Sequence, residues 1–146
     1  VAGGDINRAL RVETADAGVL LIKHHPHAPA GMFHAEARAL AWLAQAGALR
    51  VPAVVWAGDD GLALEWIEPG IPAADHDERL GAGLAALHRA GAPCFCADED
   101  GFIATIAQSN RPTPTWARFY CERRIAPLVR AAVDGGLLDP EIVPAA

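Results

Sequence analysis

The order of apolar and polar residues predicts a β-hairpin followed by a helix in the first third of the chain. Residues 6–14 and 19–23 are expected to be strands, because apolar residues recur at even steps in the first segment and fill the second. Residues 15–18 form the turn between them. Residues 32–46 then have helical spacing, with an apolar stripe made by Phe33, Ala37, Leu40 and Ala44.

A second pair of short strands is expected after the helix. Residues 53–57 and 62–67 have the composition of strands, and the Asp-Asp-Gly sequence at 59–61 favours a tight turn between them. Two hairpins that bracket one helix predict an α+β arrangement, in which an antiparallel sheet carries a helix on one face.

The second half of the chain is predicted to be mostly helical. One helix is expected over residues 78–90, capped by one of the aspartates just before it. Residues 92–115 are expected to be irregular. Thr115 is expected to cap a further helix, which Pro127 should kink or end. The expected anchors of that helix are Trp116, Phe119 and Tyr120.

Length and composition indicate one globular domain. The chain has 146 residues, of which 52% are hydrophobic and 21% are charged. A formal net charge of −6 argues against a general nucleic-acid binder, which needs a basic surface. We expect no membrane partner and a cytoplasmic location, because no apolar run reaches bilayer length and no leader is recognisable. The chain begins at Val1 without a methionine, which suggests a piece whose natural ends lie elsewhere.

The cysteines and histidines predict no metal ligands in this chain. Cys94, Cys96 and Cys121 are an odd, sparse set that fits a reducing compartment better than a disulfide framework. The Cys-Phe-Cys pair lacks further zinc ligands, so buried or idle thiols are expected. Prolines mark an exposed, solvated loop around the four histidines that follow the second strand: His24, His25, His27 and His34.

Candidate chemistry gathers in the first 36 residues. Gly3 and Gly4 would let backbone N–H groups approach phosphates, because no Cβ stands in the way. Lys23 ends the second strand and could reach those phosphates, and Glu36 on the next helix could hold the lysine. Taken singly, each charged residue is more often a solvated side chain. Their order along the chain favours a phosphate anchor.

Several motifs, in order along nearly the whole chain, resemble the fructosamine kinase family. These are protein-kinase-like small-molecule kinases, related to aminoglycoside and choline phosphotransferases. The motifs are G-G-D-I-N at 3–7, I-K at 22–23, M-F-H-A-E-A at 32–37, L-E-W-I-E-P-G at 64–70, L-A-A-L-H at 84–88 and E-R-R-I-A-P at 122–127. The resemblance implies a nucleotide-binding small lobe over residues 1–68. Residues 69–146 would be the linker and the first helices of the large lobe.

The resemblance also implies an ATP site. Lys23 would pair with the α- and β-phosphates, and Glu36 would hold Lys23. The loop that covers the nucleotide would consist of Gly3, Gly4, Asp5, Ile6 and Asn7. At the adenine, Leu64 would lie behind the ring and Trp66 would border the cleft, while the edge of the base would bond to the backbone of Glu65 and Ile67.

The implied reaction transfers the γ-phosphoryl group of ATP, with Mg²⁺, to a sugar hydroxyl of a ketosamine on a glycated amine or protein. The family's His-Gly-Asp catalytic loop and its magnesium-binding aspartate lie downstream of Ala146. This chain is therefore expected to hold only the nucleotide-positioning half, with no catalytic residue and no metal ligand, and to be inactive alone. Relatives carry Asn-Phe-Ile-Gly where this chain has Gly-Phe-Ile-Ala at 101–104. The cysteine often found in the family's glycine loop is absent here, and Asp5 occupies its neighbourhood.

Two alternatives remain at this stage. An aminoglycoside- or choline-type kinase would share the same lobe and differ in the substrate pocket. A non-catalytic interaction module would use the lobe as a scaffold, and ATP titration would separate it from a kinase. The residues do not identify the sugar or amine substrate, nor the oligomeric state.

Overall fold

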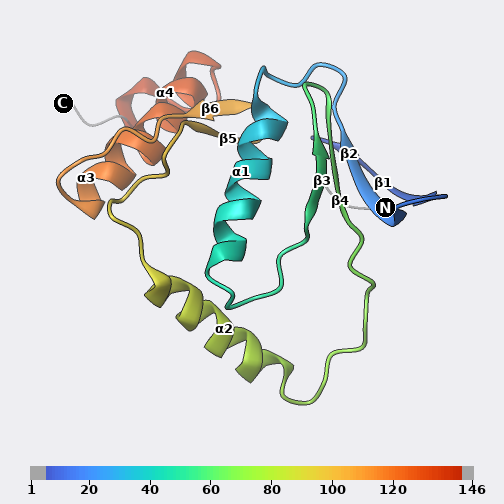
Figure 1. Ribbon diagram of the computed structural model, residues 1–146. Coiled ribbons are helices and arrows are strands. Elements are labelled where there is room, and N and C mark those ends of the chain that lie inside the picture. Colours follow the sequence, from blue (N-terminus) through green and yellow to red (C-terminus); the bar gives the residue numbers. More distant parts are fainter. Residues whose placement is uncertain (1–5, 143–146) are drawn as a thin grey trace. The chain divides into compact units, whose positions relative to one another are not determined.

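The computed structural model describes residues 6–142, which form two compact units (Figure 1). The first unit runs to Gly91 and also includes residues 102–106, while the second comprises residues 92–101 and those from 107 onward. The expected lobe boundary at residue 68 stays a prediction. The elements of the first unit are β1 (Arg8–Thr14), β2 (Gly18–His24), α1 (Met32–Gln45), β3 (Val54–Ala57), β4 (Gly61–Glu65) and α2 (His76–Ala90).

The four strands of the first unit form one antiparallel sheet in the order β1-β2-β4-β3. Thr14 closes the first hairpin, because its hydroxyl accepts a hydrogen bond from the Ala17 N–H at 3.0 Å and donates one to the Gly18 carbonyl at 2.9 Å. Gly18 has φ of 70°, a left-handed conformation that glycine adopts without strain. Both predicted hairpins are confirmed, with strand ends that differ by one or two residues.

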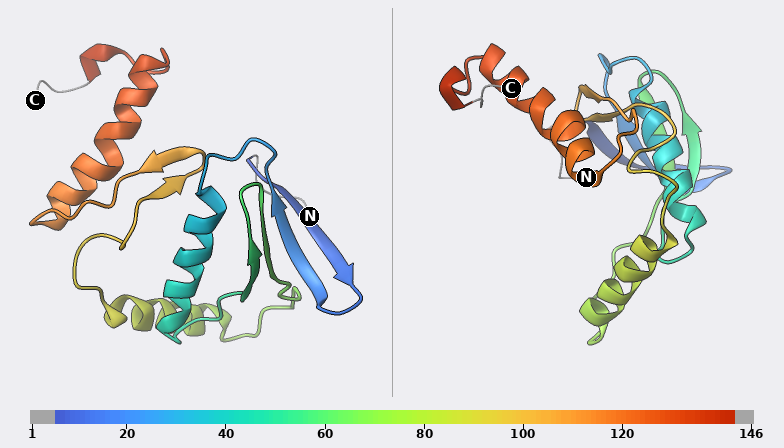
Figure 2. Two further views of the ribbon diagram at one scale, coloured as in Figure 1. Left: turned by 45° about the horizontal axis from the view of Figure 1, so that its top comes forward. Right: turned by 90° about the vertical axis from the view of Figure 1, so that its left-hand side faces the viewer.

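Helix α1 lies along β3 and β4 (Figure 2) and packs against the sheet through side chains from Met32 to Leu40. On the predicted stripe, Ala37 and Leu40 contact the core, but Ala44 near the end of the helix is exposed. The buried core cluster consists of Met32, Phe33, Leu62 and Leu64.

Helix α2 begins at His76, two residues earlier than predicted. Asp75 occupies its cap position, although the carboxylate makes no capping hydrogen bond. Gly83 lies so close to Leu49 that an added Cβ would stand 2.4 Å from a methyl carbon of that leucine. A glycine at this position therefore lets α2 pack against the segment that follows α1.

The chain after α2 contains a hairpin that the sequence did not predict. Strands β5 (Gly101–Ile103) and β6 (Ile106–Gln108) pair within the region that was expected to be irregular. Strands of three residues are too short to give a recognisable alternation, which explains the error. Ala104 at the turn has φ of 54°, the left-handed region that favours glycine.

A helical segment dominates the second unit. It consists of α3 (Trp116–Tyr120), a π-helical turn (Cys121–Ile125) and α4 (Ala126–Asp134), followed by a 3₁₀ turn (Pro140–Ile142). The Thr115 hydroxyl caps α3 by accepting from the Arg118 N–H at 3.3 Å, as predicted. Of the three expected aromatic anchors, Phe119 is buried, whereas Trp116 and Tyr120 are half-exposed.

Pro127 does not end this helical segment. It lies in the first turn of α4, where the missing N–H group is not needed. The preceding π-helical turn lets the backbone continue into α4.

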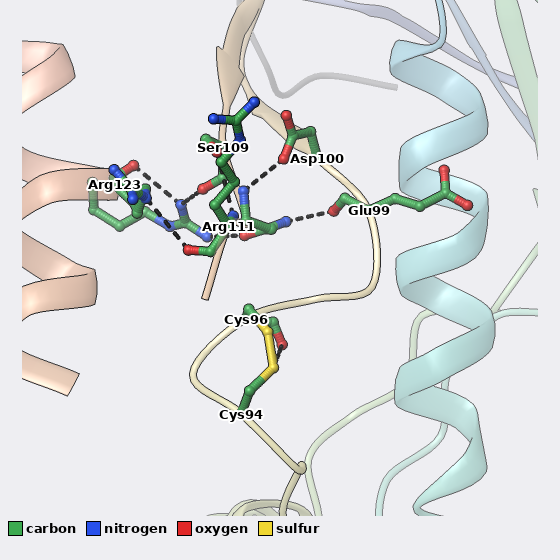
Figure 3. The surroundings of a disulfide bond; sticks show 9 residues. Cys94, Cys96, Glu99, Asp100, Ser109, Arg111 and Arg123 are labelled. Atoms are coloured by element: carbon green, nitrogen blue, oxygen red, sulfur yellow. Dashed lines mark hydrogen bonds between the residues drawn. A yellow bond between two sulfur atoms is a disulfide. The ribbon is translucent and has the colours of Figure 1, made fainter. Parts of the chain in front are cut away.

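Cys94 and Cys96 form a disulfide (Figure 3), so the expectation of idle thiols was wrong for this pair. The two residues are separated by one phenylalanine, and their Cα atoms lie 5.3 Å apart, within the range that a disulfide spans. Cys121 is a free, exposed thiol.

The architecture confirms the predicted α+β class with an antiparallel sheet. Between residues 6 and 142, none of the helices has the length and apolarity that crossing a membrane requires.

Candidate functional site

The central feature of the first unit is an ion pair between β2 and α1. The Lys23 ammonium lies 2.5 Å from the Glu36 carboxylate, and the side chains are 25% and 31% exposed. Partial burial reduces solvent screening, so this pair is stronger than an ion pair on an open surface.

The register of the sheet explains why Lys23 meets Glu36. Lys23 pairs with Leu62 and Leu21 pairs with Leu64, so these four side chains share one face of the sheet. That face carries α1, because Leu62 and Leu64 belong to the same core cluster as Phe33. Glu36 lies about one helical turn beyond Phe33, on the same side of α1. Its carboxylate therefore reaches the edge of the covered face, where it meets the Lys23 ammonium.

The Lys23 ammonium, held in place by Glu36, can provide a fixed positive charge for an anion. Glu36 restrains the lysine side chain, so less rotamer entropy is lost when the ammonium meets a ligand. Of the expected phosphate-covering loop, Gly3, Gly4 and Asp5 lie outside the described residues.

Ile6 and Asn7 are described and precede β1. Ile6 is exposed, whereas the side-chain oxygen of Asn7 is buried and has no hydrogen-bond partner among the residues that the structure describes. Asn7 lies two residues before Ala9, which pairs with Lys23 across the hairpin. An unpaired buried acceptor is costly and calls for a donor.

The segment expected at the adenine begins in the core at Leu64 and continues through residues 65–67, which are partly buried. Leu64 is buried in the core cluster. The Glu65 N–H donates to the Ala53 carbonyl at 2.8 Å, and the Glu65 carboxylate accepts from the Ala53 N–H at 3.1 Å and from Arg50 at 2.7 Å. The hydrogen bond from Arg50, with that from the Ala53 N–H, lowers the pKa of the Glu65 carboxyl group below its ordinary value. The Glu65 side chain therefore braces the start of β3.

Trp66 follows, partly buried, and makes three contacts. Its backbone N–H donates to the Val19 carbonyl at 3.4 Å, and its indole N–H donates to the Glu68 carboxylate at 2.6 Å. The Arg11 guanidinium lies 5.5 Å from the centre of the ring, a cation–π distance. These contacts fix the indole beside β1. Neither Arg11 nor Glu68 was expected there from the sequence.

Two of the four histidines do not lie in the expected exposed loop: His24 ends β2 and His34 lies in α1, and both approach the turn between β3 and β4. His24 lies 3.8 Å from Asp60, and His34 lies 3.8 Å from Asp59. The His25 N–H also donates to the Asp60 carbonyl at 3.0 Å. The pairing of β2 with β4 brings the end of β2 next to the β3–β4 turn, because His24 pairs with Gly61. Within residues 6–142, no three side chains of His, Cys, Asp or Glu are placed to hold a metal ion.

Comparison with known proteins relates this geometry to one family. The family model for fructosamine kinase matches residues 1–143 of the chain. A probable ketoamine kinase from Thermus thermophilus is 41% identical over 132 residues, which cover 90% of this chain and 47% of that protein. One from Enterococcus faecium is 35% identical over 130 residues, covering 86% of this chain and 44% of that protein.

Solved structures give the same result for the fold. A crystal structure from Thermobifida fusca, provisionally named fructosamine-3-kinase, has a TM-score of 0.84 and 41% identity, and covers 97% of this chain and 50% of that chain. A similarly named structure from Haemophilus somnus has a TM-score of 0.83 and 25% identity, and covers 94% of this chain and 48% of that chain. The chain thus spans about half the length of the relatives it matches.

Proposed function

The chain belongs to the fructosamine kinase family, and on that premise we propose that it is the nucleotide-positioning half of an ATP-dependent kinase for ketosamines. The observation that carries the proposal is the Lys23–Glu36 ion pair, a restrained and partly buried cation on the helix-covered face of the sheet. Lys23 would contact the α- and β-phosphates of ATP, and Glu36 would hold its ammonium in position.

The remaining nucleotide contacts would come from residues ahead of the edge strand β1 and from residues after β4. Ahead of β1, the covering loop would consist of Gly3, Gly4, Asp5, Ile6 and Asn7. The unpaired oxygen of Asn7 supports a ligand or a further part of the chain at this position. After β4, the adenine would lie against Leu64, beside Trp66, and along the backbone of Glu65 and Ile67.

The bonds of Glu65 refine the proposed adenine contact. Its N–H already donates to Ala53, and its carboxylate is engaged by Arg50 and Ala53. The backbone group of Glu65 that can meet the base is therefore its carbonyl oxygen, which would accept from the exocyclic amino group of adenine. The donor to the ring nitrogen would come from the Ile67 N–H.

The residues present fit ATP better than they fit Mg²⁺. Lys23 supplies a positive charge for phosphate, and within residues 6–142 no three side chains of His, Cys, Asp or Glu gather at one place. From the family resemblance we infer that the metal ligands and the aspartate that accepts the hydroxyl proton are supplied by sequence outside this chain. The chain alone would bind ATP weakly and transfer no phosphoryl group. Because the reaction consumes ATP, we also infer a cytoplasmic location.

Titration of the chain with Mg²⁺-free ATP, followed by NMR chemical shifts, tests this proposal. We expect saturable binding in the millimolar range, about 4 kcal/mol, with perturbations on β2, on the first turns of α1 and at residues 64–67. Lys23→Ala should weaken the binding at least about tenfold, because a charge-assisted contact contributes about 1.5–3 kcal/mol. Arg8→Ala, which removes an exposed cation from the neighbouring strand, is the matched control.

Two other outcomes would redirect the assignment. A chain that binds no ATP at any accessible concentration would support a non-catalytic scaffold. Phosphorylation of an aminoglycoside or choline, and not of a fructosyl-amine, by the enzyme that contains this half would support the related kinases. Sugar phosphorylation by the chain alone would overturn the proposal that it holds only the nucleotide-positioning half of the kinase.

A further inference from the structure

The disulfide of the second unit holds an aromatic side chain at the apex of a small ring. Phe95 stands between Cys94 and Cys96, so the disulfide closes a loop with a sequence separation of only two residues. The Phe95 ring packs edge-on against Trp116, with ring centroids 6.0 Å apart and planes at 61°. Trp116 begins helix α3, so the loop is attached to the helical segment through this aromatic pair.

The same loop is attached to the helical segment at its other end (Figure 3). The Glu99 carbonyl accepts from the Asn110 side-chain amide at 2.7 Å, and the Asp100 carboxylate accepts from the Asn110 N–H at 2.7 Å. The Asn110 side-chain oxygen in turn accepts from Arg124, which also donates to the Ser109 carbonyl at 2.8 Å. Arg124 belongs to the π-helical turn, so these bonds connect the acidic end of the loop to the helix.

Both contacts of the loop, through Trp116 and through Arg124, lead to the same residue, Phe119. The Arg124 guanidinium lies 4.6 Å from the centre of the Phe119 ring, and that ring stacks on Trp116 with centroids 6.0 Å apart. Phe119 is buried, while Phe95 and Trp116 are 46% and 53% exposed. The contact between Phe95 and Trp116 therefore lies at the exposed edge of the aromatic cluster. At such an edge, the contact depends on the conformation of the loop that carries Phe95.

Two properties of the disulfide make a purely structural role a poor explanation. A ring that spans two residues restricts the unfolded chain far less than a long loop does, so it adds little to global stability. Both cysteines are only partly buried, so an external thiol can reach the sulfur atoms. What the bond does restrict is the conformation of residues 94–96, and hence the direction of Phe95.

We propose that Cys94 and Cys96 form a reversible redox site that controls the packing of Phe95 on Trp116. The reductant is a dithiol, such as dithiothreitol or a thioredoxin-type protein, which supplies the two electrons. A thiolate of the reductant attacks one sulfur, the S–S bond breaks, and the second thiol of the reductant displaces the protein from the mixed disulfide. Two electrons and two protons pass to the pair, leaving two thiols on the protein and a disulfide on the reductant. Oxidised glutathione reverses the step and leaves as two molecules of glutathione.

This site does not depend on the proposed kinase function, because its effect is read within the second unit. The chain contains four tryptophans, of which Trp42, Trp56 and Trp66 belong to the first unit. The indole N–H signals of the ¹⁵N-labelled protein therefore provide one reporter, Trp116, and three internal references. The Trp116 signal is assigned with Trp116→Phe.

Titration with dithiothreitol and then with oxidised glutathione tests the proposal. Reduction should raise the thiol count from one, Cys121, to three per chain, shift the Trp116 indole signal and leave the other three signals in place. Oxidised glutathione should restore the starting spectrum. Cys121→Ser should keep the whole response. The double variant Cys94→Ser with Cys96→Ser should fix the Trp116 signal at its reduced position and abolish the response.

The variant Phe95→Leu tests whether Phe95 transmits the state of the Cys94–Cys96 disulfide to the Trp116 indole signal. In Phe95→Leu the pair should still gain and lose two thiols, but the shift of the Trp116 signal should fall to less than half of its original size. A Trp116 signal that is identical in both redox states would overturn the proposal. So would a simultaneous shift of all four indole signals, which would indicate unfolding, or a reduced pair that oxidised glutathione cannot close.

Discussion

In the first unit six hydrophobic residues are buried, four of them in one cluster between α1 and the sheet, whereas Phe119 is the buried hydrophobic residue of the second unit among those described. The second unit relies instead on the hydrogen bonds of Arg124 and on stacked aromatic rings. Burial of apolar area is non-directional and tolerates small changes in shape. Hydrogen bonds of a partly buried guanidinium such as that of Arg124 are directional, so each partner is needed. The two units should therefore respond differently to substitutions.

The largest effect is expected in the core of the first unit. Phe33 is fully buried, so Phe33→Ala should lower the free energy of unfolding by about 3–5 kcal/mol, through lost transfer free energy and a residual cavity. Urea denaturation followed at the indole signal of Trp56, which is present in this variant and in its control, measures this loss. Trp42→Phe, which changes an exposed side chain on the same helix, should cost much less. A loss below about 1 kcal/mol for Phe33→Ala would show that the cluster is not the source of stability.

A smaller loss is expected for the polar network of the second unit. Arg124→Ala should cost about 1–3 kcal/mol, because Asn110 and the Ser109 carbonyl lose their donor. Burial lowers the pKa of Arg124, an effect that the nearby charge of Asp100 opposes, so the guanidinium is partly desolvated and its bonds matter more. The urea midpoint at Trp116 reports this unit.

The matched control for that network is Arg130→Ala, which removes an exposed arginine from α4. It should leave the Trp116 midpoint within experimental error. If both arginine variants had the same effect, the hydrogen bonds of Arg124 would not distinguish this unit from an ordinary helical surface.

The β5–β6 turn should show a gain in stability. Ala104 has φ of 54°, where a Cβ is strained, so Ala104→Gly should raise the free energy of unfolding by about 0.5–1 kcal/mol. Ala107→Gly in β6 should have the opposite sign, because glycine in a strand loses conformational entropy. Equilibrium urea unfolding of both variants compares the two signs, and a loss on Ala104→Gly would show that the turn does not hold the left-handed conformation.

The smallest effect is a pH dependence at Glu65. The pKa of this carboxyl group is lowered in the folded chain, so its ionised form adds stability above the ordinary carboxyl pKa. That contribution is lost as the pH falls through the lowered value. Between about pH 6 and about pH 3, the urea midpoint of Glu65→Gln should therefore fall less than that of the unchanged chain. Asp16→Asn, in the exposed β1–β2 turn, should reproduce the original slope.

The first unit could be predicted because its structure follows from periodicity. Even spacing identified β1, helical spacing placed Phe33 on the core side of α1, and Glu36 followed one turn later on the same side. Ala44 was predicted to lie on the core side but is exposed, because helical spacing does not indicate how far the sheet extends beneath the helix. The bracing of Glu65 by Arg50 was missed, since it depends on the register of β3 against β4.

The second unit could not be predicted to the same extent, because its contacts depend on single side chains. Nothing in the spacing of Cys94 and Cys96 distinguishes idle thiols from a disulfide, and the partners of Arg124 lie 14 and 15 residues away. Pro127 was expected to disturb the helix, and the π-helical turn before it was not foreseen. The domain boundary at residue 68 and the nucleotide roles of residues 3–7 and 64–67 remain predictions.

A double-mutant cycle on ATP binding tests the central claim most directly. The dissociation constant for Mg²⁺-free ATP is measured for the unchanged chain, Lys23→Ala, Glu36→Ala and the double variant. If Glu36 acts by holding Lys23, Lys23→Ala should weaken binding at least about tenfold and Glu36→Ala by a smaller factor, and Glu36→Ala should have no further effect once Lys23 is absent. An ATP dissociation constant that is unchanged by Lys23→Ala would contradict the account.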